Sequence, residues 1–566
     1  MAEKSNYRIV LVIILGAFLP LLFMDCANQL PPGGGQVDTT PPEIVGTYPE
    51  NGAISFSDNH IEIEFSEYVE KRTFQEALFI SPAFQGQMEF EWSGHSVRVN
   101  FPEKLKENIT YVVTIGTDVV DLNNKNRLAQ AYSFSFSSGN KIDRGVAYGK
   151  VYSNTPSGIM LFAYSLDSLN INPSTVKPKY ISQTGKQGEY SLRGLAFGKY
   201  RIFAIKDEYR DLIYDIGTDS YGSPFRDVEL SEKDSLVKGL DFFLTREDTA
   251  KPRLLSAAMT DRYHLLVSYS EPVDSTLYLS KNFVLIDSTL NKTIQPVFAF
   301  QGRGKRNEMV LAIKENLSEP NNIFLFAKEL RDLSGNSTGD DYTRITVTDK
   351  PDTSAPLIIK TIPPDRASGV ETMHPRISFF FDDGFDSLRV RSSAISIADR
   401  SGVRYPFSIS FIDDASFNIN ILADLKPRQD YYITLPLNSF TDVAGNKIDS
   451  VYKYSFTTFT GTDFSGVSGT VVPASDMSPK NIIVVLQDAE NARRIYKKKT
   501  GEKLDFDFSR VEPGKYIIWS FQSRDSSVNY NYGKPWPFKP ADRFTVSPDT
   551  LNLRARWPVS DVTVSY

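Results

Sequence analysis

Apolar and polar residues alternate in short stretches along most of the chain. Residues 61–65, 97–101, 132–136 and 417–421 each place an apolar side chain at every second position. Because successive side chains of a strand point to opposite faces of a sheet, this period buries one face and exposes the other. Pro, Gly and Asn, which favour turns, punctuate the chain between such stretches. The pattern predicts an all-β chain built from small β-sandwiches.

Three short strings recur in a fixed order and define a repeated unit. An Asp-Thr-x-x-Pro string opens the unit, an acid follows an alternating strand, and an Asp-x-x-Gly-Asn turn comes later. The acids of these strings are, copy by copy, Asp38, Glu67 and Asp121; Asp248, Glu271 and Asp332; and Asp352, Asp383 and Asp442. The first turn, "DLNNK", is a looser copy. The near-constant spacing indicates a unit of about 100 residues, which we call A.

The recurring turn has a structural explanation. Its Gly and Asn suit backbone positions with positive φ, and its Asp side chain can accept hydrogen bonds from the local backbone. We therefore interpret the string as a turn that each sandwich needs, and not as a catalytic motif.

A second unit, B, fills the gap after the first A unit and recurs at the end of the chain. Its markers are a Gly-Lys-Tyr string at Gly198 and Gly514 and a Tyr-Gly string at Tyr221 and Tyr532. The order A-B-A-A-B predicts five domains of similar size. We place these domains, called segments 1 to 5 below, at residues 39–139, 144–247, 248–349, 352–460 and 464–566.

The first 38 residues have a different character. Residues 9–24 carry no charge and follow Lys4 and Arg8, which is typical of an export signal; a spanning helix needs about 20 apolar residues. Cys26, the only cysteine, stands directly after this stretch and resembles the lipid-modified cysteine of bacterial lipoproteins. We predict a signal peptide at 1–25 and a lipidated tether at 26–38. The bulky residues before Cys26 depart from the lipoprotein pattern, so an uncleaved N-terminal anchor is the alternative.

These motifs together resemble known families. The A units are similar to the bacterial Ig-like domain of surface-layer proteins, and the B units resemble the carboxypeptidase regulatory-like, or prealbumin-like, domain. With Cys26 and the following tether, the chain resembles the Ig-domain lipoproteins of Bacteroidetes. The resemblance implies a tandem array of five β-sandwiches, an envelope location and a scaffold or binding role. It brings no catalytic residues and no cofactor.

Composition and charge narrow the functions further. The chain has 566 residues and a formal net charge of -6, so it has no basic excess with which to neutralise phosphates. Nucleic acid is therefore excluded as an expected partner.

Candidate catalytic and metal residues are few. The four histidines, His60, His95, His264 and His374, form no motif with metal-ligand spacing, so we expect no metal or catalytic histidine. The acids in "FDDGFDS", Asp382, Asp383 and Asp386, offer the oxygen ligands that calcium prefers but lack EF-hand spacing. We interpret them as a solvated edge or a turn cap.

One aromatic loop in segment 5 is the candidate ligand site. It contains Tyr530, Tyr532, Trp536 and Phe538. Exposed aromatic rings in a Pro-rich loop are suited to bind sugar or protein. Packing is the alternative, because "YGSPF" at Tyr221 stands at the equivalent place in segment 2. We expect Trp519 and Trp557 to fill the core.

The sequence thus predicts a non-enzymatic outer-membrane lipoprotein that acts as an envelope scaffold or adhesion component. The alternatives are an accessory subunit of an outer-membrane assembly, secretion or uptake complex, and a glycan-binding accessory protein. Expected partners are the membrane, through the lipid, and an outer-membrane protein or glycan. Residues 27–30 lack the acidic run that resembles a surface-export signal, so we favour the periplasmic face.

Overall fold

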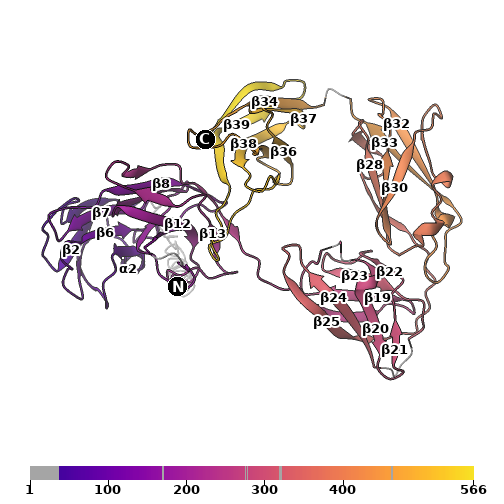
Figure 1. The fold of residues 1–566 in the computed structure, drawn as a ribbon, viewed down its shortest axis with the longest axis horizontal. Coiled ribbons are helices and arrows are strands. Elements are labelled where there is room, and N and C mark those ends of the chain that lie inside the picture. Colours follow the sequence, from indigo (N-terminus) through magenta and orange to yellow (C-terminus); the bar gives the residue numbers. More distant parts are fainter. Residues whose placement is uncertain (1–36, 168–170, 275, 277, 318–321, 461–462) are drawn as a thin grey trace, which may run out of the picture.

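The computed structural model describes residues 37–566, except 168–170, 275, 277, 318–321 and 461–462. The predicted signal peptide and Cys26 lie outside the described residues. Strands dominate, and they group into sheets within five successive stretches of chain (Figure 1). The predicted all-β fold class, a tandem array of sandwiches, is confirmed. Within the described residues, the one α-helix is α2 (Lys71–Ala77).

Segment 1 is a sandwich of two sheets. One sheet has the order β1-β2-β5-β4, from β1 (Ile44–Tyr48), β2 (His60–Phe65), β5 (Ser96–Asn100) and β4 (Glu89–Ser93). The other has the order β3-β6-β7, from β3 (Leu78–Ser81), β6 (Thr110–Ile115) and β7 (Tyr132–Ser137). The alternating apolar residues of β2, namely Ile61, Ile63 and Phe65, are fully buried between the sheets.

Segment 4 repeats this order of strands and adds one strand, β27, to the edge of the second sheet. Its sheets are β26-β28-β31-β30 and β27-β33-β32-β29. The strands are β26 (Ile358–Ile362), β27 (Ala367–Val370), β28 (Arg376–Phe381), β29 (Ser396–Asp399), β30 (Phe407–Asp413), β31 (Ser416–Ile421), β32 (Asp430–Pro436) and β33 (Val451–Thr458).

Segment 3 follows the same path but closes differently. Its strands are β18 (Leu254–Met259), β19 (His264–Tyr269), β20 (Phe283–Asp287), β21 (Lys292–Ile294), β22 (Phe298–Phe300), β23 (Glu308–Ala312), β24 (Ile323–Arg331) and β25 (Ser337–Thr346). The long strand β25 pairs antiparallel with β24 and parallel with β18. This parallel pairing joins the two layers into one eight-stranded sheet around a single core.

Segments 2 and 5 share a second arrangement. In segment 2, β8 (Gly145–Tyr152) pairs antiparallel with β11 (Glu189–Leu195) and parallel with β15 (Leu236–Val237). In segment 5, β34 (Ser465–Val472) pairs antiparallel with β37 (Asp505–Val511) and parallel with β40 (Val559–Ser565).

The opposing sheets of segments 2 and 5 also correspond. Segment 2 has the order β10-β9-β12-β13, from β10 (Tyr180–Gln183), β9 (Met160–Ser165), β12 (Gly198–Lys206) and β13 (Ser220–Gly222). Segment 5 has the order β36-β35-β38-β39, from β36 (Ile495–Lys499), β35 (Ile482–Asp488), β38 (Gly514–Gln522) and β39 (Arg543–Leu553). Short strands β14 (Val228–Leu230), β16 (Phe242–Phe243) and β17 (Thr245–Arg246) extend the sheets of segment 2.

The structural interpretation of the Asp-x-x-Gly-Asn turn is confirmed. Asp332 and Asp442 are buried, and each accepts a 2.7 Å hydrogen bond from the backbone N–H of the Asn four residues later. Gly335 and Gly445 adopt φ values of 89° and 92°, which glycine allows without steric cost.

Neither of the two tryptophans that we expected in the core is fully buried. Trp557 is 73% exposed, so the prediction that it fills the core is wrong. It lies in the tight turn before β40, where a backbone bridge joins it to Arg554 and its side chain points away from the sheets. Trp519 is partly buried and packs on segment 2, as described below.

Among residues 37–566, outside the gaps named above, we find no helix with the length and apolar character needed to span a membrane.

Candidate functional sites

The acids of the three recurring strings converge in space. Oxygen atoms of Asp248, Glu271 and Asp332 lie within 4.8 Å of one another. In segment 4, Asp352, Asp383 and Asp442 form an equivalent group. The strings are far apart in each unit because one belongs to its start, one follows an early strand, and one is the late turn. The fold brings them to the same end of the sandwich.

Electrostatic repulsion is concentrated in these groups. Burial raises the pKa of Glu271, and the charges of Asp248 and Asp332 raise it further. In segment 1, burial also raises the pKa of Glu67, with contributions from Asp121 and Asp38. Clustered carboxylate oxygens are what a calcium ion would use, so these residues could hold a cation.

Hydrogen bonds within each acidic group also hold its residues together. The side-chain amide of Asn336 donates to Asp332 and to the backbone oxygen of Asp248, both at 2.9 Å. Asn126 makes the corresponding bond to the backbone oxygen of Asp38 at 3.0 Å. Each group therefore ties the start of its segment to the late turn, and this role is structural whether or not a cation binds.

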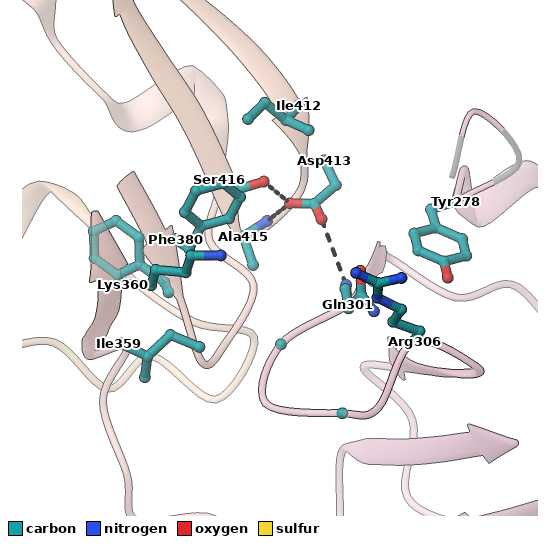
Figure 2. Close-up of a pocket in the computed structure, with 13 residues that line it drawn as sticks. Tyr278, Gln301, Arg306, Ile359, Lys360, Phe380, Ile412, Asp413, Ala415 and Ser416 are labelled. Atoms are coloured by element: carbon teal, nitrogen blue, oxygen red, sulfur yellow. Dashed lines mark hydrogen bonds between the residues drawn. The ribbon is translucent and has the colours of Figure 1, made fainter. Parts of the chain in front are cut away.

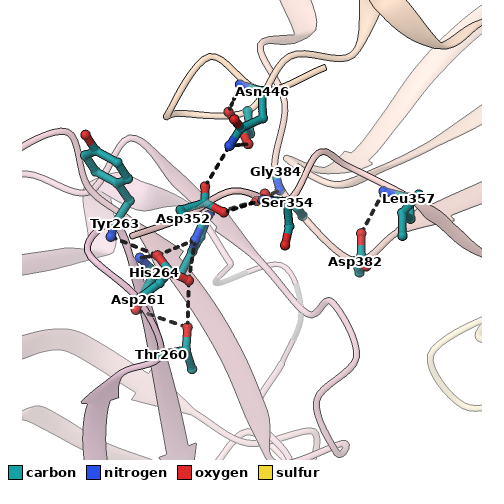
Figure 3. Close-up of polar contacts among 12 residues, drawn as sticks. Thr260, Asp261, Tyr263, His264, Asp352, Ser354, Leu357, Asp382, Gly384 and Asn446 are labelled. Carbon is teal, nitrogen blue, oxygen red and sulfur yellow. Dashed lines mark hydrogen bonds and ion pairs between the residues drawn. The ribbon is translucent and has the colours of Figure 1, made fainter. Parts of the chain in front are cut away.

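A charged histidine links segments 3 and 4 (Figure 3). Nδ1 of His264 lies 2.9 Å from an oxygen of Asp261, and Nε2 forms a 2.9 Å ion pair with Asp383 of segment 4. Burial lowers the pKa of His264, but the two carboxylates outweigh it and raise the pKa to about 10. The imidazolium is thus charged at neutral pH and bridges two acids, which is an arrangement for holding domains together.

Other contacts make the boundary between segments 3 and 4 extensive. The backbone N–H of Ala299 donates to Asp414 at 2.8 Å, and Arg303 forms a 2.8 Å ion pair with Asp382. Phe300 is fully buried in the core of segment 4 although it belongs to segment 3. The two segments are therefore packed against each other, and not merely joined by a linker.

Segments 2 and 5 pack together through aromatic rings. Phe243 stacks on Phe544 of segment 5, with ring centroids 4.0 Å apart. The same ring makes edge contacts with Trp519 and Tyr530, at 5.2 and 5.4 Å, and Tyr152 contacts Phe544 at 5.6 Å. These residues form one cluster with buried aliphatic side chains of β35, so the contact excludes water.

Polar contacts surround that aromatic cluster. Lys534 forms an ion pair with Glu247 at 2.5 Å. The hydroxyl of Tyr221 donates a hydrogen bond to the backbone oxygen of Gly533 at 2.9 Å. Two further hydrogen bonds run to backbone oxygens of segment 2: from Arg524 to Phe225 at 2.6 Å, and from the N–H of Ala541 to Pro224 at 3.1 Å. The side chain of Glu247 is only 15% exposed. Segment 5 thus returns to segment 2, and Figure 1 shows segments 2 to 5 arranged in a ring.

The predicted aromatic site lies at this ring closure. Tyr530 belongs to the aromatic cluster, and the ring of Phe538 lies 6.0 Å from that of Phe203 and 3.5 Å from the guanidinium carbon of Arg201. Both rings therefore face segment 2. Trp536 is partly buried.

The remaining member of the loop, Tyr532, is 40% exposed. It lines a shallow cavity of about 370 Å³ together with Tyr530 and with Tyr221 of segment 2. The structure thus brings Tyr530 and Tyr532 to one cavity, and it turns Tyr530 and Phe538 toward segment 2. The ligand role of the loop stays a prediction.

Sequence reasoning missed the residues that join the segments. His264 follows Asp261 by three residues, but nothing in the sequence indicates that Asp383 is its other partner. Phe243 stands in an ordinary strand-like stretch, "DFFL". Contacts between segments lack a sequence period, so only the folded chain reveals them.

Comparison with known proteins gives a family for part of the chain. The bacterial Ig-like domain family matches residues 38–138 and 352–458. A search of curated proteins finds no match.

Among solved structures, the N-terminal part of the bacterial S-layer protein SbsC is 12% identical, covering 37% of this chain and 44% of that one, with a TM-score of 0.17. The Bacillus cereus major pilin subunit BcpA is 10% identical, covering 75% of this chain and 99% of that one, with a TM-score of 0.13. Immunoglobulin domains 1–4 of Sidekick-1 are 11% identical, covering 68% of this chain and 97% of that one, with a TM-score of 0.19. Such low scores carry no argument about function or domain arrangement. Segments 1 and 4 are thus matched as bacterial Ig-like domains within an all-β chain.

Proposed function

We propose that this protein is a non-enzymatic scaffold or binding component of the bacterial cell envelope, held at the outer membrane by a lipid on Cys26. The observation that carries the proposal is the packing of segment 5 on segment 2. A string of domains joined by linkers alone would sample many orientations, whereas this contact gives the domains one arrangement.

The contact has the features of a stable interface. Aromatic pairs contribute about 0.5–1.5 kcal/mol each beyond the burial of their surface, and Phe243 takes part in several. The ion pair between Lys534 and Glu247 is largely desolvated on the Glu247 side, which makes its geometry specific. A rigid frame of this kind presents its outer surfaces in a constant geometry.

The proposed location rests on the leader and on the match to a bacterial Ig-like domain. Metabolic labelling with an alkyne analogue of palmitate tests it: the wild type should be labelled and found in outer-membrane fractions. The Cys26→Ser variant should be unlabelled. A labelled variant, or an unlabelled wild type, would reject lipidation at this residue.

The membrane face and the partner are separate questions. Protease treatment of whole cells should leave the protein intact if it lies on the periplasmic face, and should degrade it if it is surface-exposed. A pull-down from detergent-solubilised membranes tests the alternative role: a stoichiometric outer-membrane partner would favour an accessory subunit of an assembly, secretion or uptake complex.

A glycan-binding role is the other candidate, and the cavity beside Tyr530 and Tyr532 favours it. Binding to a glycan array that is lost in Tyr532→Ala would support this role. Tyr532 is the suitable position because its ring is 40% exposed and meets the ring of Tyr530 edge-on, at 4.9 Å, instead of lying inside the cluster.

A further inference from the structure

A second cavity, of about 400 Å³, lies between segments 3 and 4 (Figure 2). Its volume falls in the range of small-ligand pockets, roughly 300–1,000 Å³. Residues from both segments line it, so it exists only because the two domains are packed together. It is separate from the aromatic loop of segment 5 and from the His264 ion pairs.

Two cations border this cavity from opposite segments. Arg306 belongs to segment 3 and Lys360 to segment 4, and Figure 2 shows their charged ends on opposite sides of the space. Arg306 forms no ion pair with any carboxylate in the part of the chain that the structure describes. Lys360 lies over the ring of Phe380, 5.5 Å from its centroid, and likewise has no carboxylate partner among those residues. The cavity therefore favours an anionic group.

The interior adds hydrogen-bonding groups that a purely anionic ligand would not satisfy. Tyr278 is only 5% exposed, and its hydroxyl has no hydrogen-bond partner among the described residues. Asp413 accepts short bonds from Ser416 and Ala415 through Oδ1, at 2.5 and 2.9 Å. Its Oδ2 receives only a long 3.4 Å bond from Gln301, so this oxygen can still accept a hydrogen bond.

The walls of the cavity are apolar. Phe380, Ile359 and Ile412 line it, and the last two are partly exposed, at 36% and 49%. A simple anion such as phosphate would leave this surface uncovered and would face the carboxylate of Asp413. An apolar ligand would make no use of the hydroxyl of Tyr278 or of the two cations, Arg306 and Lys360, which are exposed at the border of the cavity.

We propose that this cavity binds an anionic saccharide, a sugar ring bearing a carboxylate or sulfate. The acid group lies between Arg306 and Lys360, the hydroxyls bond to Tyr278 and to Oδ2 of Asp413, and the C–H faces of the ring contact the apolar wall. The inference goes beyond the envelope-scaffold role and does not depend on the lipid anchor.

Isothermal titration calorimetry on the purified full-length chain tests this site. The probes are digalacturonate, a sulfated disaccharide and a neutral disaccharide of the same size. We expect one or both acidic probes to bind and the neutral probe to bind at least about tenfold more weakly, because a charge-assisted hydrogen bond to a cation is lost. The two acidic probes distinguish a carboxylate ligand from a sulfate ligand.

Single variants assign the binding to this cavity. Arg306→Gln should lower the affinity for the acidic probe by about tenfold or more. Tyr278→Phe should lower the same affinity by a few-fold. The matched control is Lys305→Gln, which makes the same charge change one residue earlier on a side chain that does not line the cavity; it should leave affinity unchanged. Near-ultraviolet circular dichroism confirms that each variant remains folded.

Several outcomes would overturn the proposal. These are no binding of either acidic probe at millimolar concentration, equal binding of the neutral probe, or equal effects of Arg306→Gln and Lys305→Gln. Binding of an acidic peptide in place of the saccharides, lost in Arg306→Gln, would show that the cavity serves a protein partner instead.

Discussion

The carboxylate of Glu271 has a pKa raised first by burial and then by the charges of Asp248 and Asp332. A carboxyl group whose pKa is higher in the folded state destabilises the fold when ionised, and this cost develops as pH rises above the ordinary value of 4.5. We therefore expect Glu271→Gln to raise the melting temperature at neutral pH in the presence of a chelator. The corresponding gain in the free energy of unfolding is less than about 1 kcal/mol, since solvent screens the charges. It disappears below about pH 4, where the carboxyl group is protonated in both states.

A matched control and calcium complete that experiment. Glu329→Gln makes the same charge change on an exposed side chain of segment 3 and should leave the melting temperature unchanged. If calcium occupied the three carboxylates, replacing the chelator by calcium would stabilise the wild type and not Glu271→Gln. A melting temperature lowered by Glu271→Gln in chelator would contradict the repulsion described above.

His264 gives a second effect at the scale of one residue. Its pKa of about 10 lies above the ordinary value of 6.5, so its ion pairs stabilise the fold fully below about pH 6.5 and lose this contribution as pH rises toward 10. His264→Gln leaves Asp261 and Asp383 without their cation and should cost about 3 kcal/mol at neutral pH, with a smaller cost near pH 9.

Differential scanning calorimetry at several pH values between about 6.5 and 9 measures this difference. His374→Gln is the control, because the side chain of His374 is 61% exposed. Its ion pair with the exposed carboxylate of Asp424 is long, at 3.7 Å. A wild-type melting temperature that is flat over this range, or equal losses in the two variants, would show that His264 does not carry the linkage.

At the scale of the element, the Asp-x-x-Gly-Asn turn can be tested through Asp332. This buried side chain accepts backbone hydrogen bonds from Ser334 and Asn336 and a side-chain bond from Asn336. Asp332→Ala leaves these donors unsatisfied, which costs about 1–3 kcal/mol. Leu333→Ala changes the next residue of the same turn, whose side chain is 75% exposed, and should cost far less. Urea denaturation of both variants compares them, and equal losses would rule out the turn interpretation.

Strands and turns were largely predictable from local patterns. The alternation of apolar residues places β2, β5, β7 and β31, because burial on one face demands a period of two. The joining of both layers of segment 3 by β18 and β25 was not predictable, since a parallel pairing between distant strands has no local signal. The exposure of Trp557 was missed for a related reason: residue type alone does not say on which side of a turn a side chain lies.

At the scale of the whole molecule, ring closure depends on the contact between segments 2 and 5. We expect the double variant Phe243→Ala and Lys534→Glu to release segment 5, because it removes the central ring of the aromatic cluster and reverses the charge beside Glu247. Small-angle X-ray scattering should then report a larger radius of gyration.

Lys515→Glu is the control for the charge change, since Lys515 is an exposed residue of β38 in the same segment and lies 3.8 Å from Glu490 of that segment. It should not alter the scattering curve. An unchanged radius of gyration in the double variant, with segment 5 still folded, would mean that this contact does not hold the ring closed.

The sequence by itself determined the β fold class, the order of the repeated strings and the local role of the turn, because these depend on side-chain period and on backbone preferences within a few residues. It also indicated an aromatic loop in segment 5. Only the tertiary structure decided what that loop faces, which acids meet in each A unit, and that His264 joins segment 3 to segment 4. These contacts bring together residues as far as 312 positions apart, as with Tyr221 and Gly533, and the free energy that selects them comes from burial and charge pairing between whole domains.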